Sequence, residues 1–358
     1  MRVPGSRWTR LTGAVGVAAA ATAWRRHRRR SAVRVGAGPG VRTDDGVLLH
    51  VETDGPDDAA LTVVLVHGFA ASMDQMAQQR ATLARHARVV ALDLRGHGHS
   101  GWRAPRRVDV DRLARDLTAV VESRTRGPVV LVGHSLGGMA VMALARSRPD
   151  LVGSVVAGVA LLSTSSGGLA RTVLPGPVAD IATRTGLAHA VLLAAWLLAP
   201  LADAARPFRR SWGRRWLARR LVADPGRHPD VPATMADVRS GLPRANTVAF
   251  YPGIVDHDGT AGLELLRDVP SLVLTGTEDR TIPAEHSRRI ADALGGRTTL
   301  VHVPGAGHMV TVTHPEPVGR ELVALLQRVE RALPRAGAPA GDPDGAGDHH
   351  LLTAITCP

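Results

Sequence analysis

The stretch Val129-Val-Leu-Val-Gly-His-Ser-Leu-Gly-Gly138 is the most informative part of the sequence. Its four leading apolar residues are typical of a strand buried on both faces of a sheet. An apolar segment of helical length follows from Leu136 to Ser147 and stops before Pro149. A serine between two glycines, on a sharp turn from a strand into a helix, is the pattern of a nucleophile elbow. This stretch therefore predicts a parallel α/β sheet that presents Ser135 as a nucleophile.

Apolar runs on both sides of this stretch predict further strands. Val47–Thr53 alternates between apolar and polar residues, which indicates an edge strand. Continuous apolar runs predict buried strands at 61–66, 88–92, 155–162, 271–275 and 299–303, and helical spacing appears at 110–121, 288–294 and 318–333. Strands that alternate with helices predict an α/β fold, with a mostly parallel sheet of about eight strands and helices on both faces.

The alternation of strands and helices breaks between residues 167 and 268. This stretch is helical in character, and we interpret it as a helical cap inserted into the core, which comprises 41–166 and 269–333. The cap contains an apolar block, Leu187–Leu201, and then a basic stretch, Arg206–Arg220, that includes Trp212 and Trp216. Arginine and tryptophan together favour the surface of a membrane, although such a stretch is also typical of a solvated helix face.

A nucleophilic serine needs a histidine base and a carboxylate that orients the base. In this architecture the chain order is serine, acid, histidine, and both partners follow strands at the carboxyl edge of the sheet. Asp279 ends the segment Gly276-Thr-Glu-Asp279 after one predicted strand, and His308 ends Gly305-Ala-Gly-His308 after the next. We predict that Asp279 and His308 act with Ser135, with Glu278 as the alternative acid.

An oxyanion hole requires two N–H donors near the nucleophile. The backbone N–H of Leu136 is one candidate, and the N–H of Phe69, in the segment His67-Gly-Phe-Ala70, is the other. The histidines near these loops are expected to be structural. Histidine is a common metal ligand, but the two residues His97 and His99 are too few for a metal site by themselves.

Five segments together resemble the α/β-hydrolase superfamily, and within it the capped serine esterases and the monoacylglycerol-lipase-like enzymes. They are His67-Gly-Phe69, Asp93-Leu-Arg-Gly-His-Gly-His-Ser100, Gly133-His-Ser-Leu-Gly137, the Gly-Thr-Glu-Asp segment and Gly305-Ala-Gly-His308. The resemblance covers residues 41–333. It implies hydrolysis of a small-molecule or lipid-like ester without cofactor or metal. Serine rather than aspartate at position 135 argues against the epoxide hydrolase and haloalkane dehalogenase branches.

The fold and the set of serine, histidine and aspartate do not by themselves identify the reaction. Acyl transfer, amide hydrolysis or C–C bond cleavage uses the same three side chains. A protein that only binds a ligand in the capped pocket is a further alternative, and the intact set of Ser135, Asp279 and His308 argues against it.

The charge of the chain is concentrated at one end. The formal net charge is +12, there is no lysine, and residues 1–35 hold nine arginines and no acid. The rest of the chain is nearly neutral, which argues against a nucleic-acid partner. The arm 1–40 contains a short apolar run, Leu11–Trp24, that fits a membrane anchor, a cleaved signal or a soluble tail.

Arginines after an apolar run favour retention of the following domain on the cytoplasmic side. We therefore expect a cytoplasmic protein, with attachment to the inner face of the membrane through the arm and the cap as a hypothesis. The single cysteine, Cys357, excludes an internal disulfide. Residues 334–358 are rich in Gly, Pro, Ala and Asp, a composition that predicts a disordered tail.

Overall fold

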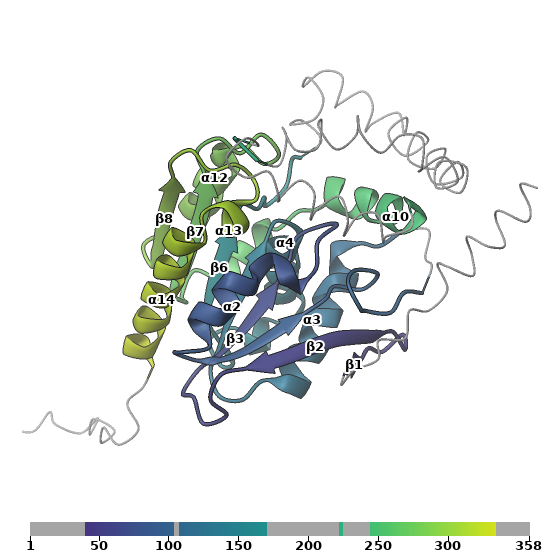
Figure 1. Cartoon of the computed structure of the whole chain (residues 1–358), viewed down its shortest axis with the longest axis horizontal. Helices are drawn as coiled ribbons and strands as arrows, with labels where there is room; N and C mark the ends of the chain where they lie inside the picture. The colour runs from purple at the N-terminus through teal and green to yellow at the C-terminus, as the bar shows by residue number, and fades with distance from the viewer. Residues whose placement is uncertain (1–39, 104–106, 170–221, 225–243, 334–358) are drawn as a thin grey trace, which may run out of the picture.

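An eight-stranded sheet forms the centre of the protein (Figure 1). The structure is a computed structural model that describes residues 40–103, 107–169, 222–224 and 244–333. The strand order is β1-β2-β4-β3-β5-β6-β7-β8. The strands are β1 (Gly40–Arg42), β2 (Leu48–Asp54), β3 (Thr62–Val66), β4 (Arg88–Leu92), β5 (Val129–His134), β6 (Val156–Leu162), β7 (Ser271–Gly276) and β8 (Thr298–Val303). The two pairings of β2, with β1 and with β4, are antiparallel and the other five pairings are parallel, so the prediction of a mostly parallel sheet is confirmed.

Helices cover both faces of the sheet, as predicted. In β3, Val64 and Val66 belong to a core that includes α3 (Val110–Arg124), α4 (Leu136–Ser147), α11 (Thr260–Leu265) and α12 (Ala284–Leu294). Val63 and Leu65 point to the other core, which includes α2 (Ala77–Leu83), α13 (Val310–Thr313) and α14 (Pro315–Ala332). Successive side chains of a strand point to opposite faces, so an all-apolar strand supplies both cores.

The edge of the sheet differs from the prediction. The sequence pattern indicated that the strand beginning near Val47 is an edge strand, but β1 pairs with β2 on its outer side, Gly40 opposite His50 and Arg42 opposite Leu48. That part of the prediction was wrong. A strand of three residues is too short to show an alternating pattern, so β1 cannot be predicted from the sequence pattern.

The short helix α2 was also not predicted. Its sequence, Ala-Gln-Gln-Arg-Ala-Thr-Leu, buries only Gln79 and Leu83, and it therefore lacks the apolar stripe by which a helix is recognised. The longer helices were found, but α12 and α14 begin at Ala284 and Pro315, a few residues before the predicted starts. Helix ends carry little periodic signal.

Most of the expected cap, residues 167–268, lies outside the described residues, and so do the Leu187–Leu201 block and the Arg206–Arg220 stretch. Its described end contains α10 (Arg244–Val255) and α11. Helix α11 packs closely on α4, because a Cβ at Gly262 would lie 2.0 Å from the Met142 carbonyl oxygen. The arm before residue 40 and the tail after 333 also lie outside the described residues. Within the described ranges, no helix is both long and apolar enough to cross a membrane.

Candidate active site

Ser135 occupies the turn between β5 and α4. Its backbone has φ 52° and ψ −115°, a conformation that non-glycine residues rarely adopt. The flanking glycines are required by close contacts. A Cβ at Gly133 would lie 2.5 Å from the backbone of Gly137 and Gly138, and one at Gly137 would lie 2.2 Å from the Val66 carbonyl oxygen. The Gly-x-Ser-x-Gly pattern is therefore a steric requirement of this turn.

A continuous chain of hydrogen bonds joins the three predicted side chains. His308 Nε2 lies 3.1 Å from Ser135 Oγ. On the other side of the imidazole ring, His308 Nδ1 lies 2.8 Å from Asp279 Oδ2. All three residues are buried. The serine comes from the end of β5, the aspartate from the loop after β7 and the histidine from the loop after β8. Parallel strands bring these three loops to one edge of the sheet.

Asp279, and not Glu278, is the carboxylate that contacts the histidine. Asp279 is buried, and its second oxygen, Oδ1, accepts the N–H groups of Thr281 and Ile282, each at 2.8 Å. Glu278 is exposed, and its backbone N–H donates to the Ala306 carbonyl oxygen at 2.9 Å. That bond ties the acid loop to the histidine loop. The second oxygen of Asp279 is thus held by two donors, which orients the first towards His308.

The segment predicted to supply an oxyanion donor lies against Ser135, since a Cβ at Gly68 would be 3.3 Å from Ser135 Cβ. The N–H groups on either side of Phe69 are occupied. Gly68 N–H donates to Gln75 Oε1 and Ala70 N–H to His97 Nε2, each at 3.0 Å. In the described part of the chain, the Phe69 N–H donates to no backbone carbonyl. Leu136 is the first residue of α4, so its N–H has no acceptor within the helix.

Two buried histidines, His67 and His97, are neutral and form hydrogen bonds with the loops around this site. His67 Nε2 accepts the N–H of Leu94 at 2.9 Å, and His97 Nε2 accepts that of Ala70. In each ring Nδ1 donates to a carbonyl oxygen, of Gly68 and Arg95 respectively. Burial lowers the pKa of His67 to about 4 and that of His97 to about 3. The expectation that these histidines are structural agrees with these contacts.

Gln75 and His134 form a connection that the sequence did not reveal. Gln75 Nε2 donates to His134 Nδ1 at 2.8 Å and to Thr311 Oγ1 at 3.2 Å, while its carbonyl oxygen accepts the Gly68 N–H. His134 Nε2 in turn donates to the His308 carbonyl oxygen at 2.9 Å. One amide group thus links the Gly68 loop, the end of β5 before Ser135 and helix α13, which follows the histidine loop. Gln75 stands in no motif, and only its place between these elements identifies it.

Helix α10 adds an aromatic wall beside the same loop. The ring of Phe69 lies 5.8 Å from that of Phe250 and 5.5 Å from that of Tyr251, measured between centroids. Phe250 is buried, whereas Tyr251 is partly exposed. Such tilted and edge-on contacts between aromatic rings are favourable. The wall makes this side of the Phe69 loop apolar.

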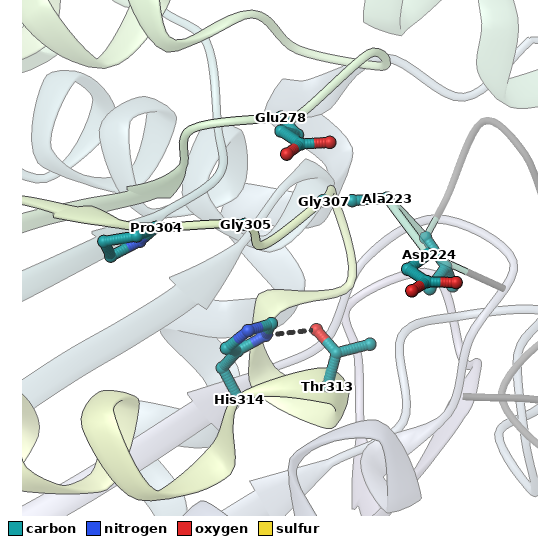
Figure 2. Close-up of a pocket in the computed structure, with 9 residues that line it drawn as sticks. Ala223, Asp224, Glu278, Pro304, Gly305, Gly307, Thr313 and His314 are labelled. Atoms are coloured by element: carbon teal, nitrogen blue, oxygen red, sulfur yellow. Dashed lines mark hydrogen bonds between the residues drawn. The ribbon is translucent and has the colours of Figure 1, made fainter. Parts of the chain in front are cut away.

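A polar cavity of about 230 Å³ lies against the histidine loop (Figure 2). Its lining includes Glu278, Asp224, His314 and the backbone of Gly305 and Gly307. Ser135, Asp279 and His308 do not line it. In the described part of the chain, metal-type ligands gather elsewhere, at His50, Asp93 and His99. The candidate site itself is a serine hydroxyl, an imidazole and a carboxylate joined by hydrogen bonds, an arrangement suited to acyl transfer to a serine oxygen.

Comparisons with known proteins agree with this architecture. The chain is 30% identical to a bifunctional esterase/perhydrolase of Acinetobacter calcoaceticus over 303 residues, covering 80% of this chain and 99% of that protein. It is 29% identical over 270 residues to the dihydrolipoyllysine-residue acetyltransferase component of an acetoin cleaving system of Pseudomonas putida. That match covers 74% of this chain, which spans 63% of the length of the Pseudomonas protein.

Among solved structures, a thermophilic esterase from Thermogutta terrifontis superposes with a TM-score of 0.63 at 25% identity, over 81% of this chain and 98% of that one. The family model described as the alpha/beta hydrolase fold matches residues 62–315, which include the serine turn and the loops that carry Asp279 and His308. This chain therefore belongs to the α/β-hydrolase family, in an esterase-like branch of it.

Proposed function

We propose that the protein is a serine hydrolase that cleaves carboxylic esters, with Ser135 as nucleophile, His308 as base and Asp279 as the acid that orients the base. The observation that carries the proposal is the pair of hydrogen bonds at His308, 3.1 Å to Ser135 Oγ and 2.8 Å to Asp279 Oδ2. A serine hydroxyl becomes an effective nucleophile when a base is positioned to take its proton. Here the base is itself fixed by a buried carboxylate.

The reaction proceeds in two halves. His308 Nε2 takes the proton of Ser135 as Oγ attacks the ester carbonyl carbon, and Asp279 stabilises the imidazolium that results. The negative charge on the carbonyl oxygen is held by the N–H groups of Leu136 and Phe69. His308 then gives its proton to the departing alkoxide, which leaves as the alcohol. Water, deprotonated by His308, attacks the acyl group and releases the carboxylic acid and free Ser135.

The aromatic side of the Phe69 loop favours an ester with an apolar group. Phe69, whose N–H is the proposed donor, carries its ring into contact with Phe250 and Tyr251. Apolar walls with a few polar groups are typical of sites for small organic ligands. Lipid-like esters fit this description, and so do small aryl or alkyl esters.

Perhydrolysis is a second candidate, because the Acinetobacter relative is a bifunctional esterase/perhydrolase. In that reaction hydrogen peroxide replaces water in the second half and attacks the acyl group on Ser135. The products are a peracid and the free serine, so the same three side chains serve both reactions.

Labelling by a fluorophosphonate probe, together with a panel of chromogenic esters and matched amides, tests the proposal. We expect labelling of Ser135 and hydrolysis of the esters at a rate well above that of the amides. Faster amide turnover would identify an amidase. Absence of both labelling and turnover would indicate a protein that only binds its ligand. Peracid formation with added peroxide tests the second candidate.

A further inference from the structure

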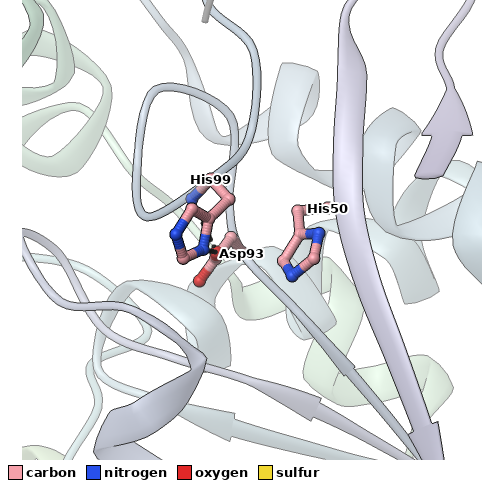
Figure 3. A group of neighbouring side chains, drawn as sticks. All are labelled: His50, Asp93 and His99. Carbon is pink, nitrogen blue, oxygen red and sulfur yellow. Dashed lines mark hydrogen bonds and ion pairs between the residues drawn. The ribbon is translucent and has the colours of Figure 1, made fainter. Parts of the chain in front are cut away.

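A second group of reactive side chains lies away from Ser135, where β2 passes the loop after β4. His50 is on β2, Asp93 is the first residue of that loop, and His99 lies six residues further along it (Figure 3). One possible ligand atom from each of the three residues lies within 4.8 Å of the other two. None of these side chains contacts the proposed nucleophile, base or acid in the hydrogen bonds described above.

The backbone holds these residues together independently of any ion. Asp93 N–H donates to the His50 carbonyl oxygen at 3.0 Å, and His50 N–H donates to Ser100 Oγ at 2.8 Å. Ser100 Oγ in turn donates to the Asp93 carbonyl oxygen at 2.5 Å. The strand and the first part of the loop, from Asp93 to Ser100, are therefore held together by hydrogen bonds. A site whose ligands are positioned in advance loses less conformational entropy when it binds.

The Asp93 carboxylate is the buried anion of the group. Its side chain is 1% exposed, and it accepts the N–H of Met73 through Oδ1 and that of His99 through Oδ2, each at 2.8 Å. A carboxylate has about four lone-pair positions, so these two hydrogen bonds do not exhaust it. His99 Nδ1 lies 3.8 Å from Asp93 Oδ2, and the His99 side chain is 77% exposed. His99 is thus an open ligand next to a fixed one.

His50 has the surroundings of a metal-binding histidine. Its Nε2 lies 3.1 Å from Glu52 Oε1, and Glu52 is paired with Arg80. In metal sites, a ligating histidine commonly donates its other ring N–H to a carboxylate, which sets the tautomer. Among the described residues, His50 Nδ1 is buried and has no hydrogen-bond partner. The imidazole therefore has an unused lone pair in addition to a carboxylate contact.

We propose that His50, Asp93 and His99 bind a divalent transition-metal ion of the Zn²⁺ type. Two imidazole nitrogens and one carboxylate oxygen are a donor set that Zn²⁺ accepts and that Mg²⁺ and Ca²⁺, which prefer oxygen, do not favour. Tetrahedral Zn²⁺ needs ligand atoms about 3.3 Å apart, given bonds of about 2 Å. The ligand atoms here lie within 4.8 Å of one another, so binding draws the side chains closer together, and the exposed His99 ring is the one most free to move. Water completes the coordination.

The expected effect of the ion is on the loop after β4. This loop also carries His97, which accepts the Ala70 N–H beside Phe69. An ion that joins β2 to Asp93 and His99 of the loop binds the folded state only, and it therefore raises the unfolding temperature. The site is structural, and the proposed hydrolysis does not pass through it.

The test uses the full chain freed of metal by a chelator. Calorimetric titration with ZnCl₂ should show one site that His99→Ala and His50→Ala each abolish. Saturating Zn²⁺ should raise the melting temperature of the unsubstituted protein by about 3 °C or more, while Mg²⁺ at the same concentration should not. Because His99 is exposed, His99→Ala should fold normally without metal, which keeps the comparison interpretable.

Two variants control for other histidines. His86→Ala removes an exposed imidazole near the end of α2, and His349→Ala/His350→Ala removes the adjacent pair in the C-terminal segment. Both should retain the zinc-dependent rise in melting temperature. The proposal is overturned if His99→Ala keeps the full rise, if the C-terminal double variant loses it, or if Mg²⁺ produces the same rise as Zn²⁺.

Discussion

His134 Nε2 donates a hydrogen bond to the backbone carbonyl oxygen of His308, 2.9 Å away, across 174 positions of sequence. This bond connects the residue before the proposed nucleophile to the residue proposed as base. Gln75 orients the His134 ring for this bond, because its amide donates to His134 Nδ1. The positions of Ser135 and His308 relative to each other therefore depend on side chains that do no chemistry.

Substitution of Gln75 tests this dependence. Gln75→Leu removes the acceptor of the Gly68 N–H and the donor to His134, so we expect kcat to fall about 10- to 100-fold with little change in KM. Gln79→Leu is the matched control. Gln79 is also buried and donates to the Thr311 carbonyl oxygen, but it has no bond to Gly68 or His134. Equal losses of kcat in both variants would show a general effect of destabilisation.

The strained backbone of Ser135 predicts that two equally inactive variants differ in stability. Ser135→Ala and Ser135→Gly should both lose at least about three orders of magnitude in kcat, because each lacks the nucleophile. Ser135→Gly should be more stable than Ser135→Ala by about 1–2 kcal/mol, since glycine tolerates φ 52°. Urea unfolding measures the difference, and identical midpoints would mean that the turn is not strained.

Substitutions of the neighbouring acids Asp279 and Glu278 should have very different effects on kcat. Asp279→Asn should reduce kcat by orders of magnitude, because the amide favours the wrong tautomer of His308. Glu278→Gln should leave kcat within about twofold, because Glu278 is exposed and the hydrogen bond to His308 comes from Asp279. Steady-state kinetics on one chromogenic ester decides the matter, and the reverse ranking would assign the acid to Glu278.

Stability should fall in acid because of the buried histidines. Burial lowers the pKa of His97 from 6.5 to about 3, so between these values the unfolded chain binds more protons than the folded one. The contribution of His97 to the free energy of unfolding is fully present above pH 6.5. It is lost as the pH falls below that value, by up to about 1.4 kcal/mol per pH unit. His97→Gln should flatten the dependence of unfolding free energy on pH between 6 and 4. His86→Gln, at an exposed site, should leave the slope unchanged.

The basic arm and the Arg206–Arg220 stretch predict binding to anionic membranes. Each arginine near such a surface contributes about 1 kcal/mol, and tryptophan favours the interface. The full-length protein should bind anionic vesicles more strongly than neutral ones, and salt should weaken the binding. Deletion of residues 1–35 should reduce it, and Trp212→Ala/Trp216→Ala should reduce it further. A protein that ignores anionic vesicles at low salt would contradict the hypothesis of membrane attachment.

Apolar periodicity was sufficient to predict most of the fold, and the chain order of the motifs was sufficient to predict that Ser135, Asp279 and His308 lie together. Buried strands are recognisable because both of their faces must be apolar, and the serine turn is recognisable because its glycines have no steric alternative. The same local reasoning selected Asp279 and His308, which follow strands at the active edge of the sheet. Glu278 remained an alternative, because two adjacent carboxylates cannot be distinguished until one of them is seen to turn inward.

Other features exist only in the tertiary structure. The edge strand β1, three residues long, is defined by its pairing with β2 and not by a pattern of its own. Gln75 serves the site because folding places it beside His134, 59 positions away. His50 likewise meets Asp93 and His99 only when β2 pairs with β4. Sequence patterns report periodicity and local backbone demands, whereas contacts between distant residues depend on how the elements pack, and only the packed chain decides them.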